Sequence, residues 1–481
     1  MGRKAASGAF YIGAAQGVRI VLTIASTIVV ARILTPADYG VIAMVGPVTA
    51  FVLLLQNLGL SHAAIQAKTL SHEQSNALFW LNLLGSLLIA VVLVVAAPLV
   101  SWFYDEPRTG YVTAASSITV VLTASSLQHA ALLARELRFR ALAAVDTAAA
   151  LCAFAATVAA AMAMRSYWAL WLGTVAGIVC NVGLLWLVSR WRPTFPIRLA
   201  GSGRLVRFGG SITVFRFLNF LSRNIDNVLI GRVWGPGLLG LYDRSYRLMM
   251  FPLQNVNAPL SRVMLPILGR LRAEPDRFRR SYLHSLHLVS LVATPAIAVA
   301  GATSAELIPF LLGQRWAGAA PIFAWLSLTG LLQPIANTSG WLFIASGRGK
   351  ALMAWGAVST VTTIAAFTIG VFWGPVGVAI AYFLSTALRL PLLFWWCVGG
   401  TSVRSIDLYA VTLTSLLGAG AAWAWVAMVS DLLSFGVTIL SAVAIAYAST
   451  FLIHWLTPEG RASVRYAFGE GWRLLAARAR P

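Results

Sequence analysis

Five polar residues share one face of an otherwise apolar stretch: Arg216, Asn219, Arg223, Asp226 and Asn227. At the 3.6-residue period of a helix they occupy an arc about 100° wide. In a helix that begins at residue 208, Arg223 lies about 22 Å along the axis, well inside a bilayer. Two arginines at such depth are unfavourable unless they face protein or water. The stripe therefore predicts a polar cavity that binds anionic or polar groups.

The same pattern allows a structural interpretation. Arg223 and Asp226 are three residues apart, so they could form an ion pair that holds neighbouring helices together. That pairing leaves Arg216 with no partner visible in the sequence. Both interpretations stay open at this stage.

Three further apolar ranges, 8–31, 239–265 and 318–345, carry polar residues at helical spacing. Arg19 lies near mid-bilayer, whereas Arg244 and Arg247 are close enough to the outer boundary for their side chains to reach it. We predict that one cavity is lined by the whole set: Gln16, Arg19, Arg216, Asn219, Arg223, Asp226, Arg244, Arg247, Gln254, Asn255, Gln333 and Asn337.

Other residues with reactive side chains give weaker patterns. Asp146 lies one turn inside an apolar range, and we expect it to pair with Arg138 or Arg140. His284 and His287 are three residues apart, but no carboxylate or cysteine lies near them in sequence, so no metal site is expected. The three cysteines lie inside apolar runs at unrelated spacings and predict neither disulfides nor zinc. No cofactor motif is present, and no catalytic residue is predicted.

The elements that must position these residues are membrane helices. Of the 481 residues, 59% are hydrophobic and 11% charged, which is too apolar for an ordinary soluble domain. The hydrophobic residues form runs of about 20, each long enough to cross a bilayer. We predict an all-α polytopic membrane protein with about fourteen spans: 8–31, 39–61, 76–102, 111–134, 142–164, 167–189, 208–231, 239–265, 282–302, 318–345, 351–373, 376–398, 407–429 and 433–455.

The net charge of +21 comes from 36 basic and 15 acidic residues. In a soluble protein such an excess would indicate nucleic-acid binding. Here the segments between spans alternate: one set, which includes both termini, carries 24 of the basic residues and the opposite set carries 5. This bias predicts a multi-pass membrane protein with both termini in the cytoplasm.

The sequence also contains an internal repeat. Residues 31–40 and 231–240 match at Arg32/Arg232, Pro36/Pro236 and Gly40/Gly240, a constant offset of 200. Six spans separate the copies, so both enter the membrane in the same direction and the halves are parallel repeats. We predict five parts: an N-terminal lobe over 1–190, a linker over 191–207, a C-terminal lobe over 208–400, two additional helices over 401–456, and a basic amphipathic tail over 457–481.

The repeated turns suggest how such lobes move. We expect the lobes to rock and expose the cavity to one side at a time. The predicted hinge residues are Pro36, Gly40, Pro236 and Gly240, because proline fixes φ and glycine adds freedom.

Taken with these spans, three segments resemble the polysaccharide transporter (Wzx-type oligosaccharide flippase) family of the multidrug/oligosaccharidyl-lipid/polysaccharide exporter superfamily: residues 31–40 (ARILTPADYG), 56–65 (QNLGLSHAAI) and 226–232 (DNVLIGR). The resemblance covers essentially the whole chain. It implies a non-enzymatic flippase of the bacterial inner membrane that moves undecaprenyl-diphosphate-linked oligosaccharides across that membrane for exopolysaccharide, capsule or O-antigen assembly. The resemblance also implies that the protein is a monomer and that its partners are a polysaccharide polymerase and glycosyltransferases.

Three alternatives stay open. A cation-coupled multidrug exporter of the same superfamily should have an acidic residue in the first span, where this chain has Arg19. A lipid II flippase shares the expected fold. A membrane glycosyltransferase or polymerase would need acidic catalytic residues on a large outer loop, and the predicted outer loops are short. The sequence leaves the sugar unit and the energy source open.

Overall fold

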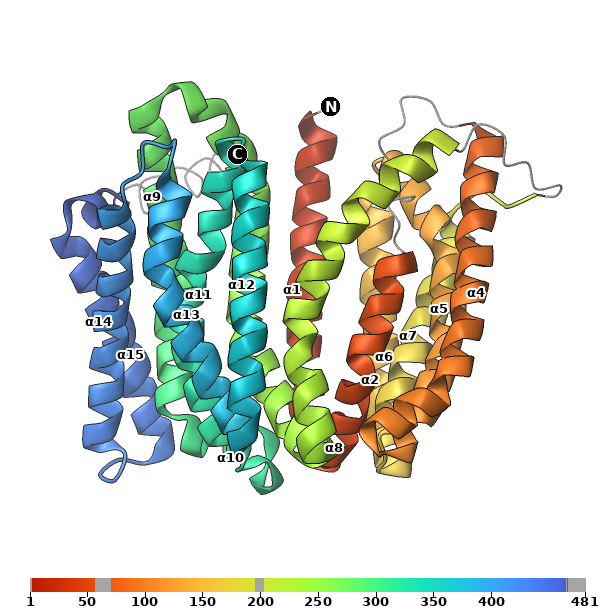
Figure 1. The fold of residues 1–481 in the computed structure, drawn as a ribbon, viewed down its shortest axis with the longest axis horizontal. Coiled ribbons are helices and arrows are strands. Elements are labelled where there is room, and N and C mark those ends of the chain that lie inside the picture. Colours follow the sequence, from red (N-terminus) through yellow and green to blue (C-terminus); the bar gives the residue numbers. More distant parts are fainter. Residues whose placement is uncertain (1, 57–70, 195–202, 464, 466–481) are drawn as a thin grey trace, which may run out of the picture. The chain divides into compact units, whose positions relative to one another are not determined.

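A computed structural model describes residues 2–56, 71–194, 203–463 and 465, without the side chains of 2–12, 14, 54–55, 203–223 and 258. Throughout these residues the regular secondary structure is helical, which confirms the predicted all-α class (Figure 1). The helices are α1 (Gly2–Ile33), α2 (Pro36–Gln56), α4 (His72–Tyr104), α5 (Pro107–Arg135), α6 (Phe139–Met164), α7 (Trp168–Val188), α8 (Gly203–Arg270), α9 (Pro275–Ala302), α10 (Ser304–Leu312), α11 (Ala319–Ala345), α12 (Gly349–Gly370), α13 (Gly374–Val398), α14 (Ser405–Val429) and α15 (Phe435–Leu456). Short 3₁₀ turns follow α8, α10 and α12.

The membrane-spanning character is confirmed by length and hydropathy. Among the described residues, 11 helical stretches are long and apolar enough to cross a bilayer, and one of them, Gly349–Val398, joins α12 and α13. The predicted spans 208–231 and 239–265 both fall within α8. Together these elements account for the predicted set of about fourteen spans.

Helix α8 consists of two arms that meet at Gly235. This residue has φ 75° and ψ −178°, a conformation that side-chain-bearing residues rarely adopt. Pro236 follows and begins the second arm, where a missing N–H is tolerated because no helical partner precedes it. The second copy of the repeated turn is therefore a sharp bend within one long helix.

The chain divides into two compact units, Met1–Gly240 and Leu241–Pro481, so the first arm of α8 belongs with the N-terminal helices. In the first unit α6 packs against α1 and α7, while α5 packs against α2, α4 and α7. The boundaries predicted for the lobes, the linker and the tail remain predictions.

In the second unit α9 packs against α11, α14 and α15. Its core includes large side chains that are almost fully buried: Tyr282, Trp341, Phe343 and Phe394. Arg279 of α9 donates two hydrogen bonds to Asp407 of α14, with N–O distances of 2.8 and 2.6 Å. A third bond of 3.1 Å reaches Glu459, beyond α15. The two additional helices are thus attached to the repeat by both packing and charge.

A second pair of turns supports the duplicated architecture. The turns before α6 and α12 both contain a residue with positive φ, Leu137 at 56° and Gly347 at 71°. The next residues, Arg138 and Arg348, have similar backbones (φ −80°, ψ 51° and φ −89°, ψ 52°). Each arginine also donates to carbonyl groups at the end of the following helix pair, Val188 for Arg138 and Gly399 for Arg348. The comparison of the two halves at an offset of 200 did not detect this correspondence, because Arg138 and Arg348 are 210 positions apart.

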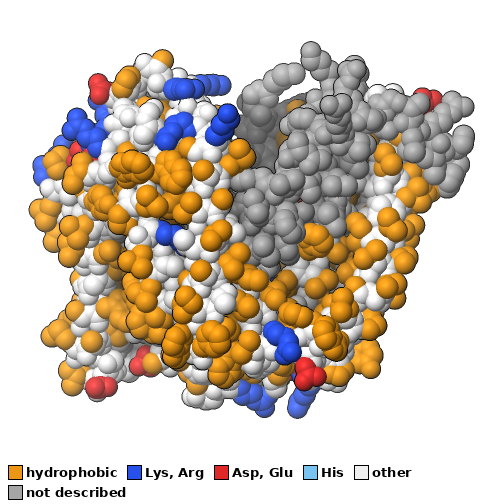
Figure 2. Space-filling view, in the orientation of Figure 1, with side chains coloured by type: hydrophobic (Ala, Val, Ile, Leu, Met, Phe, Trp, Pro, Cys, Tyr) orange, Lys and Arg blue, Asp and Glu red, His pale blue; other side chains and the backbone are white. Residues whose placement is uncertain are grey.

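The described surface fits a membrane environment. In the second unit, hydrophobic side chains cover the middle of the face shown in Figure 2, and most Lys and Arg side chains gather at one end. Between α9 and α11 lies α10, whose nine residues are too few to cross a bilayer. Of the predicted tail, residues 458–463 are helical and 466–481 lie outside the described residues.

Candidate functional site

The clearest polar group of the first unit joins α1 to α6. Arg19 donates a hydrogen bond to Gln16, and its guanidinium lies 3.7 Å from the carboxylate of Asp146. The expected pairing of Asp146 with Arg138 or Arg140 is wrong, because α6 turns this carboxylate toward α1. Arg138 instead lies 3.8 Å from Glu136. Asn181 of α7 completes the group with a 3.5 Å contact to Asp146.

The polar stripe that predicted the cavity lies on the first arm of α8, as expected. The side chains of Arg216, Asn219 and Arg223 lie outside the described residues, so both their cavity role and the Arg223–Asp226 pairing remain predictions. Asp226 is described and only 3% exposed. Its carboxylate accepts a hydrogen bond of 2.9 Å from the backbone N–H of Asn227.

The second arm of α8 carries the predicted cationic residues of the second unit. Arg247 is exposed and forms an ion pair of 2.7 Å with Asp243, a carboxylate one turn earlier that is itself buried. Arg244 is half-buried and Gln254 is exposed. The amide of Asn255 donates to the carbonyl of Phe251, 2.8 Å away, on its own helix. The exposed guanidinium of Arg247 therefore has its charge already compensated by Asp243.

A tyrosine cluster accompanies the polar residues of α11. The side-chain amide of Gln333 donates to the hydroxyl of Tyr382, at 2.9 Å. The Tyr382 ring lies 6.4 Å from that of Tyr246, on the second arm of α8. Asn337 is exposed one turn beyond Gln333. Flat amphipathic rings beside amides are suited to sugars. Sequence reasoning missed both tyrosines: Tyr382 lies in an apolar run, and Tyr246 lies between Ser245 and Arg247, where the charged residues drew the attention.

Arg389 of α13 shows what a structural membrane arginine looks like in this chain. Its guanidinium donates to the carbonyl of Ser359 at 2.6 Å and to the hydroxyls of Thr362 and Thr363 at 2.8 Å each. Its Nε donates to the carbonyl of Ser385 at 2.9 Å. These neutral acceptors hold the charge in one place, unlike the looser contacts of Arg19.

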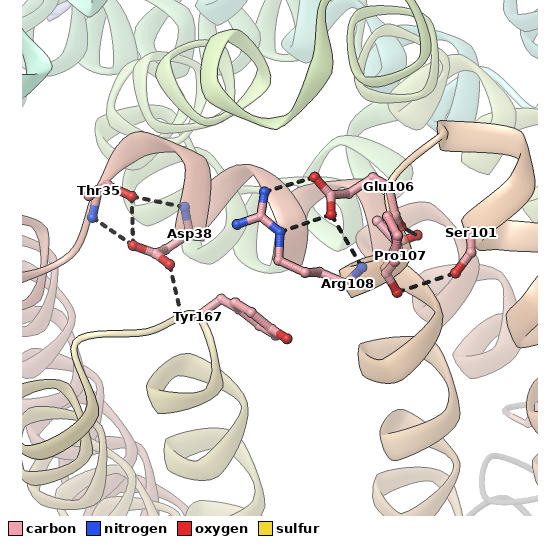
Figure 3. A network of polar contacts seen from close by, with 8 residues as sticks. Thr35, Asp38, Ser101, Glu106, Pro107, Arg108 and Tyr167 are labelled. Carbon is pink, nitrogen blue, oxygen red and sulfur yellow. Dashed lines mark hydrogen bonds and ion pairs between the residues drawn. The ribbon is translucent and has the colours of Figure 1, made fainter.

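The first repeated turn is built by a helix cap (Figure 3). The backbone N–H and the hydroxyl of Thr35 donate to Asp38, at 2.9 and 2.6 Å, and Pro36 occupies the first position of α2. The other carboxylate oxygen of Asp38 accepts from the backbone N–H of Tyr167, 3.0 Å away, which ties α2 to the start of α7. Thr-Pro-x-Asp is thus a capping sequence with a tertiary anchor.

A salt bridge lies next to that cap. Arg108 donates to both carboxylate oxygens of Glu106, at 2.8 and 2.7 Å, and its guanidinium lies 6.0 Å from the centre of the Tyr167 ring. The hydrogen bond from Arg108 holds the pKa of Glu106 below its ordinary value. This pair therefore stays ionised under mildly acidic conditions.

The two copies of the repeated turn are in direct backbone contact. A Cβ atom on Gly40 would lie 1.7 Å from the carbonyl oxygen of Pro236, and one on Gly240 would lie 1.8 Å from that of Pro36. The reciprocal contact explains why glycine and proline recur together. Neither Gly40 nor Gly240 has positive φ, so both are needed for close approach rather than for the freedom predicted from sequence. Their role as hinges remains a prediction.

The structure thus brings together some predicted site residues within each unit. In the first unit it joins Gln16 to Arg19 and adds Asp146. In the second unit it joins Gln333 to an aromatic cluster on the second arm of α8. The sequence signals for the first group were the helical spacing of Gln16 and Arg19 and the presence of an acidic residue, Asp146, within an apolar range.

Comparisons with known proteins agree with this architecture. The lipopolysaccharide biosynthesis protein WzxC of Escherichia coli (strain K12) is 25% identical over 417 residues, covering 85% of this chain and 84% of that protein. The succinoglycan biosynthesis transport protein ExoT of Rhizobium meliloti (strain 1021) is 25% identical over 349 residues, covering 72% and 70%. The fold is similar to the inward closed conformation of the lipid II flippase MurJ, with a TM-score of 0.75, 11% identity, and coverage of 92% and 98%.

A family model places these similarities in one group. The model described as polysaccharide biosynthesis protein matches residues 29–321, more than half of the chain, including the first repeated turn and all of α8. The chain belongs to the polysaccharide biosynthesis protein family.

Proposed function

We propose that this protein is a flippase that moves undecaprenyl-diphosphate-linked oligosaccharides across the bacterial inner membrane for assembly of a surface polysaccharide. The carrying observation is chemical: a chain of this family concentrates arginine, asparagine and glutamine on membrane helices. The diphosphate is anionic and pairs with arginine, while the sugars need amide and aromatic partners. No bond is broken, so the protein works as a transporter rather than an enzyme.

The cavity that we propose is lined by α1, both arms of α8, and α11. Arg19 and the stripe of Arg216 and Arg223 bind the diphosphate, and Gln333 with its tyrosine partner contacts sugar. The protein acts as a monomer. It receives its substrate from glycosyltransferases and delivers it to a polymerase.

The site test uses single variants in purified protein reconstituted into liposomes. Arg216→Ala should abolish movement of the lipid-linked oligosaccharide while membrane abundance stays near wild type, because a polar cavity tolerates a small side chain. The matched control is Arg315→Ala, an exposed arginine outside the predicted spans, which should transport normally. Wild-type rates in both Arg216→Ala and Arg223→Ala would exclude the proposed cavity. Loss of both proteins from the membrane would favour the structural interpretation.

The same liposomes separate this function from transport of lipid II. An undecaprenyl-diphosphate oligosaccharide lacking the peptide should move, and added lipid II should neither move at a comparable rate nor compete. Equal transport of lipid II would assign the chain to peptidoglycan synthesis instead.

Both termini are proposed to be cytoplasmic, on the basis of the 24-to-5 distribution of basic residues. A cysteine-free variant carrying one new cysteine tests this orientation in intact cells. A cysteine at Glu306 should react with an impermeant maleimide, and one at Arg277 should react only after permeabilisation. The reverse pattern would overturn the assignment.

The proposed mechanism is alternating access by rocking lobes. We propose that the backbone contact between the two repeated turns closes the outer side while the cavity is open inward, and that the turns separate when it opens outward. Cysteines in the two turns, joined by a reducible bifunctional reagent, should stop transport until the link is reduced. Continued transport by the linked protein would indicate a groove open to both leaflets, along which the headgroup slides without lobe movement.

A further inference from the structure

Asp146 occupies an unusual position for a carboxylate. It lies seven residues into α6, about 10 Å from the start of that helix, within a stretch that crosses the membrane. Two polar groups in the described part of the chain lie near its oxygens, Arg19 of α1 at 3.7 Å and Asn181 of α7 at 3.5 Å. The third helix packed against α6 is α5, which places none of its described charged side chains against this carboxylate.

The pair is loosely held and accessible. The Arg19 and Asp146 side chains are 43% and 47% exposed in the protein. Two half-exposed opposite charges at this depth are strongly disfavoured against hydrocarbon, so the exposed side of the pair faces water. By comparison, Arg279 and Asp407 are joined by bonds of 2.6 and 2.8 Å and are 27% and 9% exposed. Distance and exposure both allow Arg19 to exchange its partner.

The duplicated fold shows that the carboxylate is not required for architecture. The turns before α6 and α12 correspond through Arg138 and Arg348, so the eighth residue of each helix is equivalent. That residue is Asp146 in α6 and Gly356 in α12. A Cβ on Gly356 would meet nothing within 4 Å. The same helix thus folds in the second repeat without any side chain at this place.

We propose that Arg19 exchanges between Asp146 and the anionic headgroup of the substrate, and that Asp146 takes up one proton when it is displaced. The proposal rests on the proposed function. On binding, the N–H groups of Arg19 turn from the carboxylate to the diphosphate oxygens. Asp146 then lacks a counter-charge inside the membrane, and it is neutralised by a proton from the water of the cavity. On release, Arg19 returns to Asp146 and the proton leaves.

Coupling between proton uptake and headgroup binding fixes the direction and the maximum size of the pH dependence of affinity. Because binding takes up a proton, affinity for the headgroup rises as pH falls, by at most tenfold per pH unit. Asp146→Asn keeps the shape but cannot compete for Arg19 or bind the proton. At pH 8 this variant should bind the headgroup at least as tightly as the wild type does. Its affinity should no longer rise through protonation of residue 146 as pH falls.

The test is isothermal titration calorimetry of the full chain in phosphatidylcholine nanodiscs, with undecaprenyl diphosphate as the probe. Measurements at pH 6, 7 and 8, each in two buffers of different ionisation enthalpy, give both affinity and the number of protons taken up. The variants are Asp146→Asn, Arg19→Gln and, as the matched control, Asp431→Asn, an exposed carboxylate in the loop between α14 and α15. We expect the wild type and Asp431→Asn to take up about one proton more than Asp146→Asn. Arg19→Gln should bind at least tenfold more weakly.

Each outcome decides between the two proposals. Wild-type protein that fails to bind the probe at any pH overturns the proposed function and this inference with it. Binding with the same proton number and pH profile in wild type and Asp146→Asn overturns the inference alone. If the wild type takes up no proton on binding at pH 8, the inference is also overturned. This measurement needs no variant, so the test remains decisive even if Asp146→Asn does not fold.

Discussion

Substituting Gly240 tests whether the repeated turns are held together by backbone contact. A Cβ at this position would lie 1.8 Å from the carbonyl oxygen of Pro36 and 3.1 Å from the backbone nitrogen of Gly40. An ordinary carbon–oxygen contact is about 3.3 Å, so Gly240→Ala must separate the two turns by about 1.5 Å. Both neighbours are backbone atoms inside helices, which cannot turn aside as a side chain could.

The expected loss is that of an overpacked site, about 1–3 kcal/mol. For a unit of 240 residues this corresponds to a melting temperature lower by roughly 2–10 °C. The assay is thermal unfolding of the purified protein in detergent, followed by tryptophan fluorescence. Gly237→Ala is the matched control, because Gly237 lies one turn earlier on α8 and a Cβ there would meet nothing within 4 Å. Alanine at that helical position should be neutral or stabilise by up to about 1 kcal/mol.

The reasoning fails if Gly240→Ala and Gly237→Ala melt within about 1 °C of each other. In that case the turns would lie further apart than the structure has them. The reciprocal variant Gly40→Ala should behave like Gly240→Ala, since its Cβ would lie 1.7 Å from Pro236. A difference between the two variants would mean that the contact is not symmetric.

Three further predictions concern stability. Leu137→Gly should raise the melting temperature, because it removes a left-handed leucine (φ 56°) that costs about 1–2 kcal/mol, whereas Leu137→Ala should not. Arg279→Gln breaks the ion pairs to Asp407, which is buried, and to Glu459, which is exposed, and should destabilise the protein by about 1–3 kcal/mol, while Arg277→Gln removes an exposed pair and should change stability by less than about 0.5 kcal/mol. The folded-state pKa of Glu106 is lowered, so the stability from its salt bridge is present above the ordinary glutamate pKa and is lost as pH falls through the lowered value. The melting temperature of Glu106→Gln should therefore change less between pH 7 and pH 3 than that of the wild type.

The fold was largely predictable because a bilayer imposes simple requirements. Runs of about 20 apolar residues predicted the helices, and the Pro36/Pro236 match predicted the duplication. The spans 208–231 and 239–265 were expected as separate helices joined by a turn, and α8 shows them as two arms joined at Gly235. The reason for the repeated glycines was not predictable, since their close contact joins residues 200 positions apart and is invisible to local pattern.

Side-chain partners were less predictable than helices. The sequence placed Asp146 beside arginines near in sequence, but a helix projects this carboxylate toward whichever helix packs on that face. Tyr382 was missed for a related reason, because a tyrosine in an apolar run is identical in pattern to a core residue until its hydroxyl finds Gln333. Arg389 shows the opposite case, in which neutral hydroxyl and carbonyl groups hold an intramembrane charge.

The two repeats share a backbone but differ in charge, and that difference bears on how a substrate is held. At the offset of 200, Arg19 corresponds to Asn219 and Thr23 corresponds to Arg223, so polar positions are kept while the arginines change places. The carboxylate near Arg19 has only Gly356 as its counterpart. A symmetric cavity would bind a headgroup equally well in two orientations. In the mechanism that we propose, an arginine whose exchangeable carboxylate is present in one repeat only would give the diphosphate a single preferred site.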